Sequence, residues 1–259
     1  MTDLELAVAA AAAAADEIRR LFGDRAADYK GATNPVTEAD RRAEASIVTL
    51  LAEHRSDDGI LTEEGSDSAS FSDRRWVVDP LDGTVNYLHG IPQVAVSIAL
   101  EDGGGTAVGV IHDVFRDEVF AAVRGAGSQM NGVPVAVSPT AALDRALVVT
   151  GFPYDRHTNA RTYTDVVAAV LERAEGVRRL GSAALDLAWV AAGRFDGYWE
   201  FKLAPWDIAA GMLLVTEAGG AVSSSAGGPA THHDIVATNG HIHEGLRQTV
   251  AGALTDPTA

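Results

Sequence analysis

Turn dipeptides divide residues 94–137 into a series of short apolar runs. They are Asp102-Gly103, Arg116-Asp117 and Asn131-Gly132. Runs separated in this way are typical of β-hairpins, because Gly, Asn and Asp tolerate the backbone angles that tight turns require. The segment therefore predicts an antiparallel meander.

After Pro139 the pattern changes to alternating helices and strands. We expect strands at 146–151 and 195–201, and helices at 158–175, 182–193 and 205–220. Pro205 suits the start of the last helix, and Gly219-Gly220 suits its end. The change of pattern places a boundary between residues 138 and 145. It divides the chain into an N-terminal α+β region, 1–140, which carries most of the acidic site residues, and a C-terminal α/β region, 141–259.

Two helices are expected before the meander. Thr2 and Glu5 fit a capping box at the start of the first, which extends to about Phe22. Acidic residues precede its alanine run where a signal peptide would carry Lys or Arg. The second begins with Thr37 as N-cap and Asp40 three residues later. No stretch has the ~20 apolar residues of a membrane span, so we expect a cytoplasmic protein.

The charge balance excludes several classes of partner. The chain has 36 Asp and Glu against 20 Lys and Arg, a formal net charge of -16. This argues against nucleic acid and anionic membranes, which are bound through basic surfaces. A phosphorylated small molecule stays a candidate if a cation supplies local positive charge. The chain has no cysteine, which excludes disulfides and thiolate metal sites.

An apolar strand at residues 76–78 leads directly into Asp79 and Asp82. Burying an unpaired carboxylate is costly, so these two side chains predict a bound cation. Pro80 fixes the turn between them, and Gly83 lets backbone approach a ligand closely.

Three further acidic positions are Asp40, Glu63-Glu64 and Asp207. Each has a structural alternative: a helix cap, a solvated strand end and a first-turn acid that faces the helix dipole. If they converge with Asp79 and Asp82, their mutual repulsion requires a cation. Oxygen donors favour Mg²⁺, with Mn²⁺ or Ca²⁺ as competitors. Two such ions about 4 Å apart would activate water and neutralise a leaving oxygen, which predicts metal-dependent phosphoryl hydrolysis.

Two long motifs resemble the signatures of the inositol monophosphatase family. "WVVDPLDGTVNY" is similar to the first, and "PWDIAAGMLLVTEAGG" is similar to the second. "NPVTEAD", "TEEG" and "RRLGSAALDLAWVAAGRFDGYWE" follow the family's order. The resemblance implies a five-layer αβαβα sandwich. It also implies a Mg²⁺-dependent, lithium-sensitive phosphatase that forms a homodimer.

The resemblance also implies roles for individual residues. Glu63, Asp79 and the Leu81 carbonyl would hold a first Mg²⁺, and Asp79, Asp82 and Asp207 a second; Glu63 would help to hold a third, hydrated ion. Mn²⁺ is the expected substitute. Asp40 and Thr84 would orient the attacking water, with Glu63 also in the catalytic set. The implied substrate-binding residues are Asp82, Gly83, Thr84, Ser182, Ala183, Glu200 and Asp207. Thr62 departs from the family pattern, which commonly has Gly there.

Alternatives stay open for the substrate. The resemblance favours myo-inositol 1-phosphate, because Val85-Asn86-Tyr87 is similar to the inositol type. Related enzymes of the same metal core act on fructose 1,6-bisphosphate, histidinol phosphate or 3′-phosphoadenosine 5′-phosphate. A mainly regulatory binding protein of the same fold is a further alternative. His232, His233, His241 and His243 are expected to be surface or loop residues, and Trp199 to pack its strand.

Overall fold

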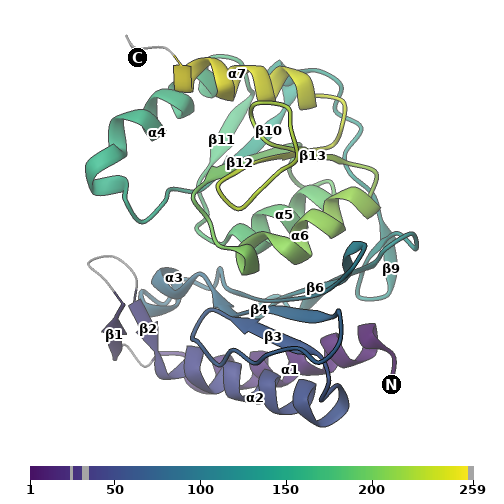
Figure 1. Cartoon of the computed structure of the whole chain (residues 1–259). Coiled ribbons are helices and arrows are strands. Elements are labelled where there is room, and N and C mark those ends of the chain that lie inside the picture. The colour runs from purple at the N-terminus through teal and green to yellow at the C-terminus, as the bar shows by residue number, and fades with distance from the viewer. Residues whose placement is uncertain (24–25, 31–34, 256–259) are drawn as a thin grey trace.

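The computed structural model describes residues 1–23, 26–30 and 35–255. Its elements stack as five layers (Figure 1). In order, the layers are helices α1 (Asp3–Arg20) and α2 (Glu38–His54), a seven-stranded sheet, helices α5 (Ala183–Ala191) and α6 (Pro205–Glu217), a five-stranded sheet, and helices α4 (Arg156–Leu171) and α7 (His243–Thr255). The predicted αβαβα sandwich is confirmed.

The seven-stranded sheet contains the predicted meander. Its strands, in spatial order, are β3 (Gly59–Thr62), β4 (Arg75–Asp82), β5 (Ala95–Asp102), β6 (Gly105–Asp113), β7 (Glu118–Val123), β8 (Ser128–Met130) and β9 (Val133–Val135). Neighbours from β4 to β9 pair antiparallel, whereas β3 pairs parallel to β4. Asp117 and Asn131 have φ of 55° and 49°, as the hairpin turns require.

The five-stranded sheet is mixed. Its strands, in spatial order, are β11 (Gly176–Arg178), β10 (Leu147–Thr150), β12 (Gly197–Phe201), β14 (Asp234–Thr238) and β13 (Ala221–Ser223). Only β10 and β12 were predicted. Helix α4 begins two residues before the predicted 158–175 and ends four residues before its end. The division of the chain into regions 1–140 and 141–259 stays a prediction. Strand β9 of the large sheet ends before this boundary, and strand β10 of the smaller sheet begins after it.

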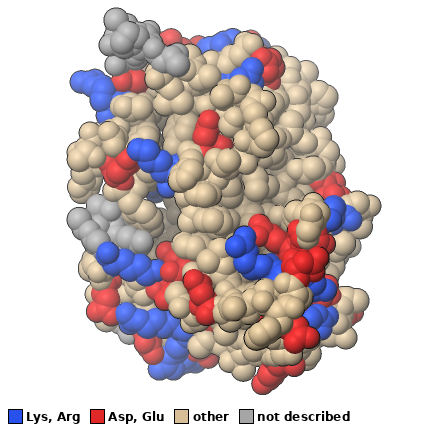
Figure 2. All heavy atoms as spheres, in the orientation of Figure 1, with Lys and Arg blue, Asp and Glu red and all other residues tan. Residues whose placement is uncertain are grey.

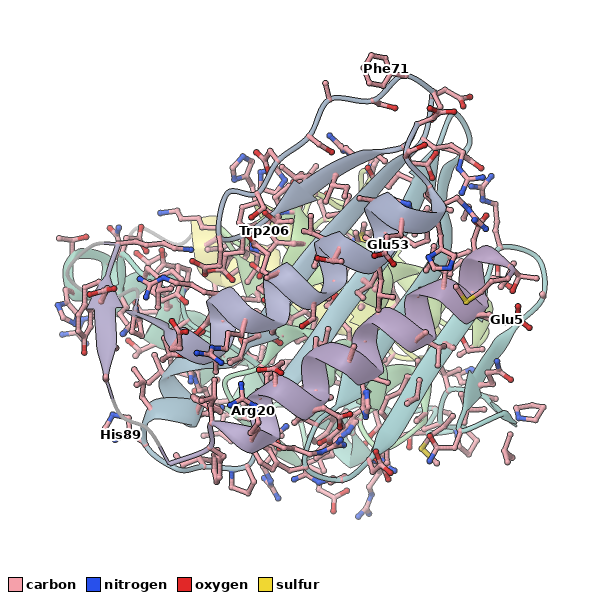
Figure 3. The ribbon with its side chains drawn as sticks, turned by 90° about the horizontal axis from the view of Figure 1, so that it is seen from below. Glu5, Arg20, Glu53, Phe71, His89 and Trp206 are labelled. Carbon is pink, nitrogen blue, oxygen red and sulfur yellow. The ribbon has the colours of Figure 1, made fainter. Side chains whose placement is uncertain are left out.

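Helices α1 and α2 lie antiparallel beneath the large sheet (Figure 3). The α1 capping box is confirmed, since Glu5 N–H donates to Thr2 Oγ1 at 3.2 Å and Thr2 N–H donates to Glu5 Oε2 at 2.8 Å. The buried alanines of α1 include Ala7, Ala10 and Ala14, so the alanine run packs against the sheet. Among the described helices, none is long and apolar enough to cross a membrane.

Smaller elements complete the described chain. They are the antiparallel pair β1 (Ala27–Tyr29) and β2 (Pro35–Thr37), the short helix α3 (Thr84–Leu88) and a 3-10 turn at Leu143–Arg145. Asn34, the first residue of the "NPVTEAD" motif, lies outside the described residues. On the face seen in Figure 2, Lys and Arg side chains are interspersed with Asp and Glu.

Successive residues of β12 pack into different cores, as alternation along a strand requires. Tyr198 belongs to the central core, which contains α5 and α6. Trp199 is 1% exposed and belongs to the outer core with residues of α4 and α7. Trp199 therefore packs its strand as predicted, and the tryptophan that lines the cavity described below is Trp206 instead.

Candidate active site

The N-terminal ends of several helices and the ends of strands β3, β4 and β12 meet at a cavity of about 580 Å³. Predicted site residues that line it are Glu63, Asp79, Leu81, Asp82, Gly83, Thr84, Ser182, Ala183, Glu200 and Asp207. Asp40 is fully buried and contacts the cavity through Thr84. The structure thus brings together all residues of the predicted catalytic, metal-binding and substrate-binding sets.

The carboxylates of this cavity raise one another's pKa. Burial raises the pKa of Asp79 well above its usual value, and the charges of Glu63, Asp82 and Asp207 raise it further. Burial likewise raises the pKa of Asp207, and the nearby Asp82 adds to this. Such a cluster is destabilising unless protons or cations neutralise it.

Asp82 is fixed by the start of α5. Its Oδ2 accepts hydrogen bonds from Ser182 Oγ at 2.6 Å and from Ala184 N–H at 2.8 Å. Ser182 is itself the N-cap of α5, with its side chain accepting from Leu185 N–H. Burial raises the pKa of Asp82 to about 6, although these hydrogen bonds act to lower it. The helix therefore orients the carboxylate without neutralising its charge.

Asp40 caps α2 and also contacts Thr84, its predicted partner. One oxygen, Oδ2, accepts from Thr37 N–H at 2.7 Å and completes the cap of α2. The other, Oδ1, accepts from Thr84 Oγ1 at 3.1 Å. Burial raises the pKa of Asp40 to about 6, and the charge of Glu64 contributes to the rise.

Gly83 joins β4 to the short helix α3. Its φ is 98°, and a Cβ placed on it would lie 2.7 Å from the carbonyl oxygen of Gln93. A side chain is therefore excluded here on two grounds. The first backbone hydrogen bond of α3 runs from Tyr87 N–H to the Gly83 carbonyl oxygen at 3.0 Å. The N–H groups of Gly83 and Thr84 precede this bond, so the helix does not use them.

Glu63 follows the last residue of β3 and lies beside the ammonium group of Lys30. Lys30 Nζ lies 3.6 Å from Glu63 Oε1 and 2.7 Å from Glu64 Oε1. Burial raises the pKa of Glu63 to about 7, against the lowering effect of Lys30. Thr62, the departure from the family pattern, accepts hydrogen bonds from Gly65 and Ser66 N–H at 3.2 and 2.9 Å, so it holds the turn that follows.

Glu200 enters the cavity from β12. Its Oε2 accepts a hydrogen bond from Tyr198 OH at 2.8 Å, and burial raises its pKa to about 7. Gly151 provides the necessary space, because a Cβ there would lie 2.1 Å from Glu200 Oε1.

The donors of this cavity fit a hard divalent cation. Glu63, Asp79, Asp82, Asp207 and the Leu81 carbonyl offer only oxygen atoms, which Mg²⁺ prefers. Their repulsion provides the reason for a cation to bind. As placed, no three His, Cys, Asp or Glu side chains of the described residues enclose a point closely enough to hold an ion. These residues therefore line the cavity without forming a closed cage.

Several lining residues were not predicted. They are Gly151, Phe152, Tyr154, Arg156, Arg179, Lys202 and Trp206, among others. The Arg178-Arg179 pair before the "GSAALD" segment was the available signal for one of them. Lys202 has φ of 53°, a conformation that favours glycine. A lysine at this position gives no reason to predict that conformation from the sequence.

One histidine prediction was wrong. His243 is not a surface or loop residue, since it is the first residue of α7 and lies between two hydroxyl groups. Its Nε2 is 2.9 Å from Ser223 Oγ, and its Nδ1 is 3.0 Å from Thr238 Oγ1. These contacts connect α7 to β13 and β14.

The sequence model of the inositol monophosphatase family matches residues 2–255. The chain belongs to the inositol monophosphatase family. It is 44% identical over 255 residues to inositol-1-monophosphatase of Synechocystis, covering 96% of this chain and 89% of that protein. It is 42% identical over 236 residues to the Nus factor SuhB of Escherichia coli, covering 89% and 87%. The crystal structure of SuhB from Bartonella henselae superposes with a TM-score of 0.91 at 41% identity, covering 95% of this chain and 97% of that one.

Proposed function

We propose that this protein is a Mg²⁺-dependent phosphatase that releases phosphate from small phosphate monoesters, with myo-inositol 1-phosphate as the first candidate substrate. The observation that carries the proposal is the convergence of four buried or half-buried carboxylates beside the Asp40–Thr84 pair. Membership of the family supports the reaction class. The 44% identity to the inositol-1-monophosphatase of Synechocystis supports the substrate.

The proposed ligands divide between two ions. Glu63, Asp79 and the Leu81 carbonyl would hold the first, and Asp79, Asp82 and Asp207 the second, with a third hydrated ion near Glu63. Mn²⁺ would substitute for Mg²⁺. When bound, the ions supply positive charge that acidifies water and stabilises a leaving oxygen.

The chain's own groups would position the other reactants. Thr84 Oγ1 and Asp40 Oδ1 form a pair that can orient a water and accept its proton. The amides of Gly83 and Thr84 would bind the phosphate, because they precede the first backbone bond of α3. Ser182, Ala183 and Glu200 would contact the polyol, with Asp82 and Asp207 also near the substrate.

A panel of phosphate esters tests the proposal. Phosphate release with Mg²⁺ is measured for myo-inositol 1-phosphate, histidinol phosphate, fructose 1,6-bisphosphate and 3′-phosphoadenosine 5′-phosphate, and kcat/KM values are compared. We expect turnover of small monoesters, led by the inositol ester, and inhibition by millimolar Li⁺ at modest Mg²⁺. No release from any of these esters would contradict the proposal.

The surroundings of the site also suggest how the chain assembles. We propose a cytoplasmic homodimer, with no nucleic acid or membrane partner. Val85 in α3 and Ile91 just after this helix are 41% and 48% exposed, so they offer apolar surface for a second copy. Light scattering during gel filtration tests this: a dimer mass is expected, and a monomer mass at micromolar concentration would contradict it.

A regulatory role is the second candidate, because a 42% identical relative is named a Nus factor. The two candidates separate in cells that lack this protein. If catalysis is the main role, Asp40→Asn should fail to restore the wild-type phenotype. Full restoration by this variant would favour the regulatory role.

A further inference from the structure

A buried carboxylate outside the cavity lining lies on helix α2. Glu44 is 3% exposed, although a charged side chain is seldom buried without a partner. Within the described residues, no Lys, Arg or His nitrogen lies within 4.0 Å of its carboxylate. A buried carboxylate is stable only if hydrogen-bond donors replace the water that it has lost. The neighbours of Glu44 must therefore supply such donors.

The donors come from the turn that follows β3. Glu64 N–H donates to Glu44 Oε2 at 3.0 Å, and Ser66 N–H donates to Glu44 Oε1 at 3.2 Å. The Ser66 hydroxyl donates to the same Oε1 atom. Hydrogen bonds to a charged acceptor are about twice as strong as neutral ones, so these three hold the turn firmly against α2.

This turn carries the proposed metal ligand Glu63. Glu63 lines the cavity and immediately precedes Glu64, whose N–H donates to Glu44. That N–H belongs to the planar peptide unit that joins Glu63 to Glu64. By fixing this plane, Glu44 restrains the backbone that carries the Glu63 side chain.

Two other side chains contact the same turn. Thr62 Oγ1 also accepts from Ser66 N–H, at 2.9 Å. Lys30 Nζ donates to the Glu63 carbonyl oxygen at 3.1 Å, but the lysine side chain is 34% exposed, whereas Glu44 is buried. An exposed lysine keeps much of its rotamer freedom, so Glu44, which is packed on a helix, is the more rigid support.

Glu44 lies one turn after Asp40 on the same face of α2. Asp40 Oδ1 accepts from Thr84 Oγ1 at 3.1 Å, and Glu44 holds the turn after Glu63. One helix face thus contacts both the pair that would orient the water and the turn that carries a ligand of the first ion. Because both carboxylates are on one helix, their spacing fixes Glu63 relative to the Asp40–Thr84 pair.

We propose that Glu44 is a positioning residue for the metal centre: by holding the turn after β3 against α2, it places Glu63 for the first ion. This inference rests on the proposed metal-dependent phosphatase and adds to it a residue outside the ligand set. In this role Glu44 touches neither the ion nor the substrate. Groups that orient metal ligands commonly contribute about 10–100-fold to metal affinity or activity, so the loss of this one is measurable.

Metal binding without substrate tests the proposal directly. The full chain is titrated with Mn²⁺, and the free ion is measured by its electron paramagnetic resonance signal. Glu63→Gln first identifies which bound ion depends on Glu63. Glu44→Gln keeps the shape of the side chain but replaces one acceptor oxygen with an NH₂ group, which cannot accept from a backbone N–H. In this variant the Kd of the same ion should rise about tenfold or more.

Glu53→Gln is the matched control for Glu44→Gln. It removes the same charge from an exposed position of the same helix (Figure 3). The Mn²⁺ affinity of this control should equal that of the wild type. A merely structural role of Glu44 would lower the melting temperature of Glu44→Gln but would leave the metal Kd of the folded protein unchanged.

Phosphate release gives a second readout. In Glu44→Gln the half-saturating Mg²⁺ concentration should rise by about the same factor as the Mn²⁺ Kd, about tenfold or more. Saturating Mg²⁺ should restore most of the wild-type kcat on myo-inositol 1-phosphate. If the wild type hydrolyses no ester, the phosphatase function fails, and the Mn²⁺ titration still decides the role of Glu44.

Ser66→Ala tests the same contact from its exposed side. It removes the hydroxyl that donates to Glu44, so the Kd should rise in the same direction by a smaller factor. In the double variant with Glu44→Gln, Ser66→Ala should add less than it does alone, because the two side chains act through one contact. Unchanged Mn²⁺ affinity in folded Glu44→Gln overturns the proposal. If Glu44→Gln does not fold, unchanged affinity in Ser66→Ala overturns it.

Discussion

Thr84 Oγ1 donates a hydrogen bond to Asp40 Oδ1 at 3.1 Å while Asp40 Oδ2 accepts from Thr37 N–H at 2.7 Å. One buried carboxylate therefore caps α2 and contacts the cavity at the same time. The same hydroxyl also lies 3.2 Å from the Leu81 carbonyl, a proposed metal ligand. This geometry makes the folding role and the chemical role of Asp40 separable by substitution.

Asp40→Asn should lower kcat by about 10²–10⁴-fold, the usual effect of losing a general base. Thr84→Ala should produce a similar loss, and the double variant should be little worse than either, because the pair acts as a unit. The asparagine oxygen can still cap α2, so the cost in unfolding free energy should be about 1 kcal/mol or less. Kinetics and thermal melts measure both effects. Multiplicative rate losses, or a stability loss with normal kcat, would refute the relay.

Asp82→Asn should lower kcat by more than ~10²-fold, since it removes a charge that would stabilise a bound cation. Without metal, the variant should be at least as stable as the wild type, because the charge of Asp82 raises the pKa of Asp79. At an ion concentration of 100 times Kd, binding adds about 2.7 kcal/mol to the unfolding free energy of the wild type. It should add less to the unfolding free energy of Asp82→Asn. Thermal melts with and without Mg²⁺ measure this, with the exposed Asp144→Asn as control. An equal gain from Mg²⁺ in the wild type and in Asp82→Asn would show that Asp82 is not a ligand.

Gly151→Ala should displace Glu200, because the added Cβ would lie 2.1 and 2.2 Å from its two carboxylate oxygens. We expect KM for myo-inositol 1-phosphate to rise by about tenfold, the effect of losing a charged hydrogen bond, with a smaller change in kcat. Gly252→Ala is the matched control, because a Cβ there meets nothing within 4 Å. An unchanged KM in Gly151→Ala would show that Glu200 does not contact the polyol.

His112 predicts a loss of stability in mild acid. It is 3% exposed on β6, and burial lowers its pKa below the ordinary 6.5. The unfolded chain therefore takes up a proton first, so stability is full above pH 6.5 and falls as the pH decreases below it, by at most about 1.4 kcal/mol per pH unit. His112→Gln should remove this part of the slope in denaturant titrations from pH 7.5 to 5.5 with Mg²⁺ present. His157→Gln, at an exposed position of α4, should not.

Local rules predicted the elements whose signals are local. The turn dipeptides predicted the meander, and the capping boxes at Thr2 and Thr37 predicted where α1 and α2 begin. Strands β11 and β13 are three residues long and carry no alternating pattern, so only the sheet around them makes them strands. Their prediction would have required knowledge of the tertiary pairing.

The same limit applies to the site. The carboxylates were recognisable because each follows a strand or starts a helix, and the family resemblance connected them. Arg156 and Arg179 line the cavity beside the rings of Tyr154 and Phe152, respectively, and no spacing in the sequence shows this. Lys202 has φ of 53° and its Nζ lies 2.5 Å from Asp155 Oδ2, a pairing across 47 residues that the sequence does not show.

The most direct test of the central claim is phosphate release from myo-inositol 1-phosphate by protein stripped of divalent ions with a chelator and then supplied with Mg²⁺. Lys30 offsets the charge of Glu63, but within the described residues no Lys or Arg pairs with Asp79, Asp82 or Asp207, so bound ions must neutralise these three. The account predicts no turnover in the stripped protein and recovery of full turnover with Mg²⁺, abolished again in Asp82→Asn. Full turnover in excess chelator would contradict it.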